Sequence, residues 1–175
     1  MEISSGKGVL VPGTYVSARI GALFFPFHRI EGDGGAVADL GRYSAFSIYF
    51  GRGQRVRLSD GRDWRVTALR HGGGLSPVVA DEQGRRVAQA FAGIGNYGLD
   101  TADLAYTLDP AVAGRGRSNR WLLTRHDETH ALVSRRPHTV IARQQIPMGV
   151  GLLAFLLALT GIPGESDLGV PNPYG

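Results

Sequence analysis

The stretch MGVGLLAFLLALTGI at Met148–Ile162 decides the fold, because it is apolar on every side. Apart from Thr160 it contains only apolar residues and glycine, and no residue between Arg143 and Glu165 is charged. Pro147 is tolerated in a first helical turn, and Pro163 stops a helix. The stretch therefore predicts a helix without a polar face, which belongs either in the centre of a protein or in a bilayer.

The length of this helix favours burial in protein. Fifteen residues span about 22 Å at 1.5 Å per residue, whereas the apolar core of a bilayer is about 30 Å thick. The uncharged stretch from 144 to 164 is nevertheless long enough to span a bilayer that thins locally. We therefore expect a core helix and leave a single membrane span as the alternative.

The chain before the helix predicts an all-β domain. From Gly8 to about Gln144, short β-prone runs alternate with turn signals roughly every ten residues, which is typical of sandwiches and barrels. About thirteen strands are predicted: Gly8–Val11, Thr14–Ile20, Leu23–Ile30, Ala36–Leu40, Ser44–Phe50, Gln54–Leu58, Asp63–Leu69, Pro77–Ala80, Arg85–Phe91, Asp103–Leu108, Arg120–Arg125, His130–Arg135 and Thr139–Arg143.

Turn residues indicate that neighbouring strands form hairpins. Asp60-Gly61 predicts a two-residue hairpin, because this pair readily adopts positive φ angles. The segments 81–84 and 31–35 join their strands in a similar way. Val56 and Leu58 alternate with Arg55 and Arg57, so one face of the sheet belongs to the core and the other to solvent.

Together these patterns predict a mostly β fold, a closed antiparallel barrel of about twelve strands around one hydrophobic C-terminal helix. A barrel of that size encloses more space than its own side chains fill, and one apolar helix would fill it. We expect a single domain over 1–163, with the central helix at 147–162 and a Gly/Pro-rich tail at 164–175.

This layout resembles the Tubby C-terminal-like superfamily, particularly the LURP-one-related proteins and phospholipid scramblases. The resemblance lies in the hairpins around Asp60-Gly61 and 81–84, and in the passage from 139–142 into 151–157. It covers most of the chain as an order of elements. It implies a twelve-stranded barrel closed around a hydrophobic helix, without catalysis, associated with phosphoinositide binding or membrane attachment.

Composition excludes several classes of protein. Hydrophobic residues make up 43% of the 175 residues, which argues against a disordered chain, and the absence of cysteine excludes disulfides and thiolate metal sites. The N-terminus lacks the continuous apolar region of a signal peptide, so we expect a cytoplasmic protein at the inner face of the membrane. The formal charge of +4 allows attraction to anionic lipid without requiring it.

Three motifs suggest chemistry but fit it poorly. His126 and His130 have the spacing of zinc ligands on a helix, yet the flanking residues predict two strands, so a solvated hairpin turn is the better interpretation. Gly93–Gly98 matches a dinucleotide-binding pattern without the βαβ setting that this pattern requires. The esterase-like run at 71–74 has no nucleophile elbow to accompany it. We expect no metal, no cofactor and no catalytic site.

Two groups of arginines are candidates for anion binding: Arg115, Arg117 and Arg120, then Arg135, Arg136 and Arg143. Arginine binds phosphate groups through several N–H donors at once. The first hypothesis is therefore a membrane-associating lipid-binding or scaffold module, whose partner is an anionic lipid or a membrane protein complex. Nucleic acid is a poor candidate, since aromatic residues do not interleave the arginines. The alternative is a small accessory subunit of a membrane complex, with 148–162 as its transmembrane helix.

Overall fold

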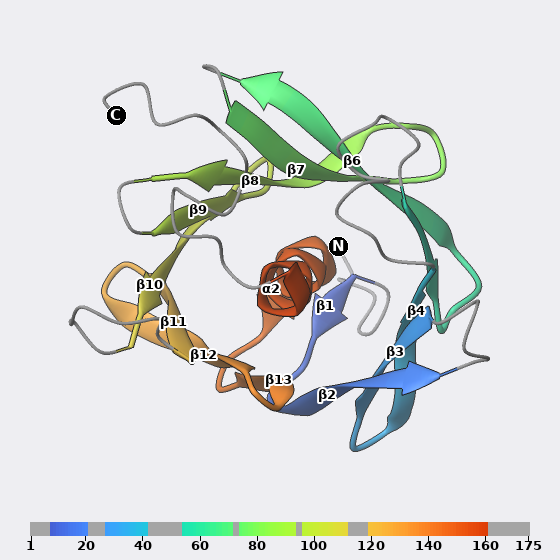
Figure 1. Cartoon of the computed structure of the whole chain (residues 1–175), viewed down its shortest axis with the longest axis horizontal. Coiled ribbons are helices and arrows are strands. Elements are labelled where there is room, and N and C mark those ends of the chain that lie inside the picture. The colour runs from blue at the N-terminus through green and yellow to red at the C-terminus, as the bar shows by residue number, and fades with distance from the viewer. Residues whose placement is uncertain are drawn as a thin grey trace, which may run out of the picture.

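The computed structural model describes residues 8–20, 27–41, 54–71, 74–93, 96–111 and 119–160. In this part of the chain, twelve antiparallel strands form a closed barrel around one helix, α2 (Met148–Thr160). Figure 1 shows the helix inside the ring of strands. The predicted fold class is confirmed.

The barrel strands follow one another around the ring in chain order. They are β2 (Gly13–Ile20), β3 (Phe27–Gly32), β4 (Gly35–Leu40), β5 (Gln54–Leu58), β6 (Asp63–His71), β7 (Gly74–Ala80), β8 (Arg86–Ala92), β9 (Tyr97–Asp100), β10 (Ala105–Pro110), β11 (Arg120–Arg125), β12 (Glu128–Arg135) and β13 (His138–Ala142). Pairing of β13 with β2 closes the barrel. An antiparallel meander of this kind leaves no free sheet edge.

A small two-stranded sheet leads the chain into the barrel. β1 (Val9–Leu10) pairs with β14 (Ile146–Pro147), which directly precedes α2. The Met148 N–H at the helix N-terminus donates to the Gly8 carbonyl over 2.7 Å. This bond satisfies one of the N–H groups that a helix start leaves without an internal partner.

The helix packs on several strands at once and is buried wherever its side chains are described. It contacts β7, β8, β9, β12 and β13, together with β1 and β14. Leu153, Ala154 and Phe155 have no exposed surface. Because neighbours surround α2, its uniformly apolar composition has a structural explanation within the barrel.

Among the residues that the structure describes, no helix combines the length and the apolar character that a bilayer crossing requires.

Strand alternation agrees with the sequence. In β5, Val56 and Leu58 are buried, while Arg55 and Arg57 are exposed. In β6, Trp64 and Val66 are likewise buried, and Arg65 between them is exposed. The predicted core face is therefore confirmed on these strands.

The turn at Asp60-Gly61 differs from the two-residue hairpin expected there. The Leu58 carbonyl accepts from the Gly61 N–H, and the Leu58 N–H donates to the Arg62 carbonyl, so the loop has three residues. Only Gly61 has a positive φ, of 89°, which fits a turn followed by a bulge. The two-residue hairpin with both central φ angles positive is instead at His126 (49°) and Asp127 (63°).

Two observed strands were not predicted from the sequence, and one predicted strand lies outside the described residues. The sequence did not predict β9, because the glycines in and around its four residues favour a loop, and it did not predict the two-residue β14. Gly8–Val11 contributes only β1, which pairs with β14 and is not one of the twelve barrel strands. The predicted strand Ser44–Phe50 and the tail at 164–175 lie outside the described residues.

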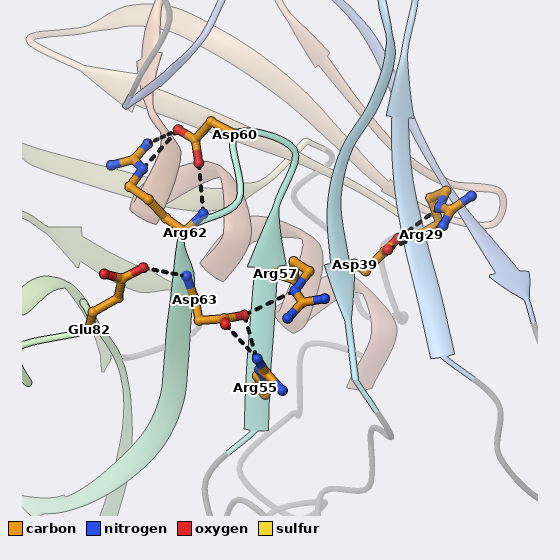
Figure 2. A network of polar contacts seen from close by, with 8 residues as sticks. All are labelled: Arg29, Asp39, Arg55, Arg57, Asp60, Arg62, Asp63 and Glu82. Atoms are coloured by element: carbon orange, nitrogen blue, oxygen red, sulfur yellow. Dashed lines mark hydrogen bonds and ion pairs between the residues drawn. The ribbon is translucent and has the colours of Figure 1, made fainter.

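Opposite charges alternate in a row across the outer face of four strands (Figure 2). Arg29, Asp39, Arg57 and Asp63 are consecutive cross-strand partners on β3, β4, β5 and β6. Arg29 Nε lies 2.8 Å from Asp39 Oδ1, and Arg57 Nε lies 3.3 Å from Asp63 Oδ1. Arg29 and Arg57 are thus paired with carboxylates as well as partly solvated.

We expect the Phe155→Ala substitution to lower the free energy of unfolding by about 3 to 5 kcal/mol, because it leaves a cavity at a site without exposed surface. Ile141→Ala is the matched control, since Ile141 is 39% exposed on the outer face. Its effect should stay within roughly 0.5 kcal/mol. Urea unfolding followed by fluorescence measures both, and equal losses for the two variants would contradict an enclosed helix.

Asp63 should contribute to stability mainly above pH 4. Hydrogen bonds from Arg55 and Arg57 lower the pKa of Asp63 from 3.8 to about 2. A carboxylate with a lowered pKa stabilises the fold above its unfolded-state pKa, and this contribution is lost as the pH falls toward 2. Thermal melts between pH 2 and 5 should show a smaller acid-dependent loss for Asp63→Asn than for the parent chain. Asp103→Asn is the control, and the account fails if both variants reduce that loss equally.

Candidate anion-binding site

Antiparallel order places the connections at two ends of the barrel. The proximal end, where α2 starts, carries the turns at 33–34, 59–61, 82–84 and 126–127. The distal end carries the turn Arg136–Pro137, the last residues of β2 and the first residues of β3 and β11. The site described below lies at the distal end.

The described arginines proposed for anion binding lie at two different ends of the barrel. Arg120 joins Arg135 and Arg136 at the distal end, because Arg120 is the cross-strand partner of Ser134. Arg143 follows β13 at the proximal end, where its N–H donates to the His130 carbonyl. The five residues of β13 separate it from the others by at least about 13 Å. Arg115 and Arg117 lie outside the described residues.

The distal arginines also face different sides of the barrel wall. Alternation with the fully buried Ala131 and Val133 places Arg135 on the inner face of β12. Arg120 is exposed and lies on the outer face of β11, one position before the inward Trp121. Arg136 is exposed at the turn between β12 and β13. Of the proposed residues, Arg135 therefore faces the interior, with Arg136 beside it.

Three more basic side chains and a serine lie beside Arg135 at inner-face positions of their strands. His138 shares the inner face of β13 with the buried Val140 and Ala142. On β2, Ser17 and Arg19 alternate in step with the buried Tyr15, although Arg19 is exposed near the end of the strand, and His28 shares the inner face of β3 with Ile30. We call these five inward residues the distal cluster: Ser17, Arg19, His28, Arg135 and His138.

Strand register brings the distal cluster together on four adjacent strands. Arg135 is the cross-strand partner of His138, and Arg19 is that of His28. Continuing the Thr139–Val16 pairing by one residue places His138 beside Ser17. Side chains opposite one another on neighbouring strands have Cβ atoms about 5 Å apart. The barrel wall therefore concentrates Arg and His side chains over a small inner surface.

Burial and the neighbouring positive charges both lower the pKa values of the two histidines. Burial lowers the pKa of His28 first, and His138 and Arg19 lower it further. Burial also lowers the pKa of His138, and Arg135 and Arg136 add to that effect. In both cases the neighbouring charges disfavour the protonated imidazole, because they have the same sign.

No carboxylate offsets these cations on the inner face. In the part of the chain that the structure describes, no Asp or Glu side chain faces the interior at the distal end. Asp39 and Asp109 are the described carboxylates nearest this end, and both point outward, since Leu40 and Leu108 beside them are buried inside. This arrangement of the described residues makes the cluster a candidate site for an anion from outside the chain.

Ser17 and His28 also resemble part of a hydrolytic site. Ser17 Oγ lies 3.3 Å from His28 Nδ1. A serine nucleophile needs a histidine that accepts its proton and a third group, usually a carboxylate, that stabilises the imidazolium. The charged neighbours of His28 are His138 and Arg19, which destabilise an imidazolium. The cluster is therefore better suited to holding an anion than to activating Ser17.

The two histidines considered as zinc ligands are separated by the hairpin. His126 is exposed in the turn, as a solvated turn requires, whereas His130 is only 6% exposed and that interpretation is wrong for it. A bulge between Leu123 and Thr124 leaves His130 as the extra residue of β12, and its ring packs edge-on against Tyr106 at 5.3 Å. No group of three metal-ligating side chains is found among the described residues.

The glycine pattern at Gly93–Gly98 also lies in an antiparallel setting. It runs from the end of β8 into β9, and these strands pair with each other. Residues 94 and 95 are outside the described part of the chain, as are 72 and 73 of the esterase-like run. A dinucleotide-binding turn requires a parallel βαβ unit, which β8 and β9 do not form.

The sequence patterns did not predict that Ser17, Arg19, His28 or His138 belongs to an anion-binding site. The signal was the alternation itself: Arg19 has the same parity as Tyr15 on β2, and His138 has that of Val140 on β13. Polar residues in core-facing positions can be found from sequence in this way. Their meeting across four strands depends on barrel closure between β13 and β2.

No family model, curated protein or solved structure matches the chain. The fold and the distal cluster therefore define the class: a helix-filled antiparallel barrel with an inward cationic site. The similarity to the Tubby C-terminal-like superfamily stays a prediction.

We expect both cluster histidines to titrate below the ordinary value of 6.5 in a buffer free of phosphate and sulfate. Arg135→Gln should raise the pKa of His138, because it removes a nearby positive charge. Proton NMR of the imidazole Cε1–H signals measures these values. Arg85→Gln, at a proximal turn, is the control and should leave His138 unchanged. An unchanged His138 titration in Arg135→Gln would contradict the cluster.

Proposed function

We propose that this protein is a non-catalytic, membrane-associating module that binds an anionic lipid headgroup at its distal cluster. The observation that carries the proposal is the set of inward Arg and His side chains without an inward carboxylate among the described residues. Arginine supplies several directed N–H donors for phosphate oxygens, and imidazole supplies one more when neutral.

A membrane surface fits the positions of the arginines around the cluster. Arg136 at the turn and Arg120 on the outer face are exposed at the same end as the cluster. Cytoplasmic leaflets carry anionic lipids, and each basic residue near such a surface contributes about 1 kcal/mol. The proposal therefore places the protein in the cytoplasm, with its distal end toward the inner face of the membrane. Any scaffold role would depend on that attachment.

The alternative of an accessory subunit anchored by α2 would require the helix to leave the barrel. Leu152, Leu153 and Phe155 would then lose their contacts with the barrel wall, and the inner faces of β7, β8, β12 and β13 would become exposed. No described contact favours that arrangement. It remains an outcome of the experiment below.

We expect the intact protein to sediment with phosphatidylcholine vesicles that contain an anionic phosphoinositide, and not with phosphatidylcholine alone. Arg135→Gln with Arg136→Gln should weaken binding about ten- to thirtyfold, given about 1 kcal/mol for each arginine. Arg85→Gln with Arg86→Gln is the matched control, since it also removes two adjacent arginines but at the proximal end. Circular dichroism melts verify that both variants fold.

Equal weakening by the two double variants would leave only general electrostatic attraction and contradict a specific site. Binding to neutral vesicles that also resists an alkaline carbonate wash would favour the anchored-subunit alternative.

A further inference from the structure

The distal cluster contains two kinds of positive charge. Arg19 and Arg135 are charged at all relevant pH values, whereas His28 and His138 change charge near neutrality. His28 and His138 lie on β3 and β13, which are both neighbours of β2. Their backbones are therefore two strand spacings apart, about 9.6 Å. Both residues occupy inner-face positions of the wall, on the strands either side of Ser17.

We propose that the distal cluster binds a doubly charged phosphate group, as found in a phosphomonoester, and that His28 and His138 take up protons when it binds. This inference rests on the proposed function and adds to it the chemical class of the ligand and its dependence on pH.

Proton uptake follows from the hydrogen-bonding capacity of imidazole. A neutral imidazole has one donor and one acceptor nitrogen, whereas a protonated one has two donors. His28 Nδ1 already lies 3.3 Å from Ser17 Oγ, so its Nε2 is the nitrogen left for a ligand. Protonation guarantees that Nε2 carries a hydrogen, and it lets Nδ1 donate to the serine oxygen. A phosphate between the two rings then meets donors from both sides.

The surrounding charges make this uptake depend on the ligand. Without an anion, Arg19, Arg135 and Arg136 oppose protonation of the two rings. The charged groups on the neighbouring outer faces, Arg29, Glu31 and Asp39, point away from the cluster. Gln54, the inward residue at the distal end of β5, is uncharged, and the described part of α2 has no ionisable side chain. A bound dianion therefore offsets the positive charge that opposes protonation of the rings.

The number of positive charges in the cluster favours a doubly charged ligand. A phosphodiester carries one negative charge, which the two inward arginines already outweigh. A phosphomonoester carries nearly two at neutral pH, enough to offset both arginines and so to remove the repulsion that opposes protonation of the histidines. The cluster should thus prefer a lipid or soluble molecule with a terminal phosphate over one with only a bridging phosphate.

The direction of the pH dependence is fixed by these relations. Burial and like charges lower the pKa of both histidines in the free protein, so both are neutral above pH 7. Binding of a dianion raises the pKa of each ring. The added affinity is present in full below the free-state pKa and is lost as the pH rises through the bound-state pKa. Each proton taken up changes affinity by up to about tenfold per pH unit.

Sulfate is the sharpest probe, because it stays a dianion throughout this range while phosphate itself titrates near pH 6. Isothermal titration calorimetry of the full chain with sulfate should show affinity falling at least tenfold between pH 6 and 8. Repeating the titration at pH 7 in buffers with different ionisation enthalpies should give an uptake of one to two protons. In His28→Gln with His138→Gln, sulfate should bind more weakly and without either effect.

His126→Gln is the control, since His126 is exposed in a proximal turn. It should leave the sulfate titration unchanged. Sulfate affinity that does not vary with pH in the parent chain would overturn the inference. The inference would also be overturned if the double histidine variant retained the full pH dependence of sulfate binding.

Two further ligands distinguish the source of the phosphate. Glycerol 3-phosphate is a soluble phosphomonoester, and vesicles with phosphatidylinositol 4-phosphate present the same group on a membrane. Tighter binding to the vesicles would identify the lipid as the ligand, while equal binding would identify the phosphate group alone. Vesicles with phosphatidylserine at equal surface charge should bind more weakly, and equal binding of the two vesicle types would overturn the preference for a dianion.

These results separate the two proposals. Vesicle binding that needs Arg135 and Arg136 but is independent of pH would retain the proposed function and reject proton uptake. Absence of binding to sulfate and to anionic vesicles would reject both.

Discussion

Apolar packing between α2 and the barrel wall is the interaction on which the rest of the structure depends. Twelve strands enclose an interior that their own side chains do not fill, and α2 fills it with residues that are apolar on every side. Two glycines let the helix come close to its neighbours. A Cβ added at Gly149 would lie 2.9 Å from the Ala88 Cβ, and one added at Gly151 would clash with the Leu10 side chain. Helix and barrel therefore form one core.

This arrangement gives the arginines of the two faces different roles. On the outer face, Arg29 and Arg57 each lie beside a carboxylate in a row of alternating charges that joins four strands. On the inner face at the distal end, Arg19 and Arg135 lie beside histidines, and no described carboxylate shares that face. The charges of the outer-face arginines in this row are therefore balanced by carboxylates of the same chain. The described residues give the inner cluster no carboxylate counterion, which is why we propose that it binds an anion.

Periodicity predicted the fold well, because a uniformly apolar helix and alternating strands leave few arrangements that bury both. It missed β9, where Gly98 interrupts a four-residue strand, and it misjudged the turn at Asp60, whose conformation depends on a bulge. The site was predicted less completely. Proximity in the sequence grouped Arg143 with Arg135 and Arg136, whereas the structure places Arg143 at the opposite end of β13 from Arg135. Arg19 and His28 meet His138 only because β2 closes the barrel against β13, and local sequence carries no sign of that pairing.

The close approach of α2 to β8 offers the most direct measurement of the account. In the full chain in aqueous buffer without detergent, proton NMR should show nuclear Overhauser cross-peaks between Gly149 Hα and the Ala88 methyl group, as the 2.9 Å approach at that glycine requires. Their presence would establish the helix inside the barrel. Their absence, together with cross-peaks from α2 to added detergent chains, would show that the helix lies outside the barrel and would contradict the central claim.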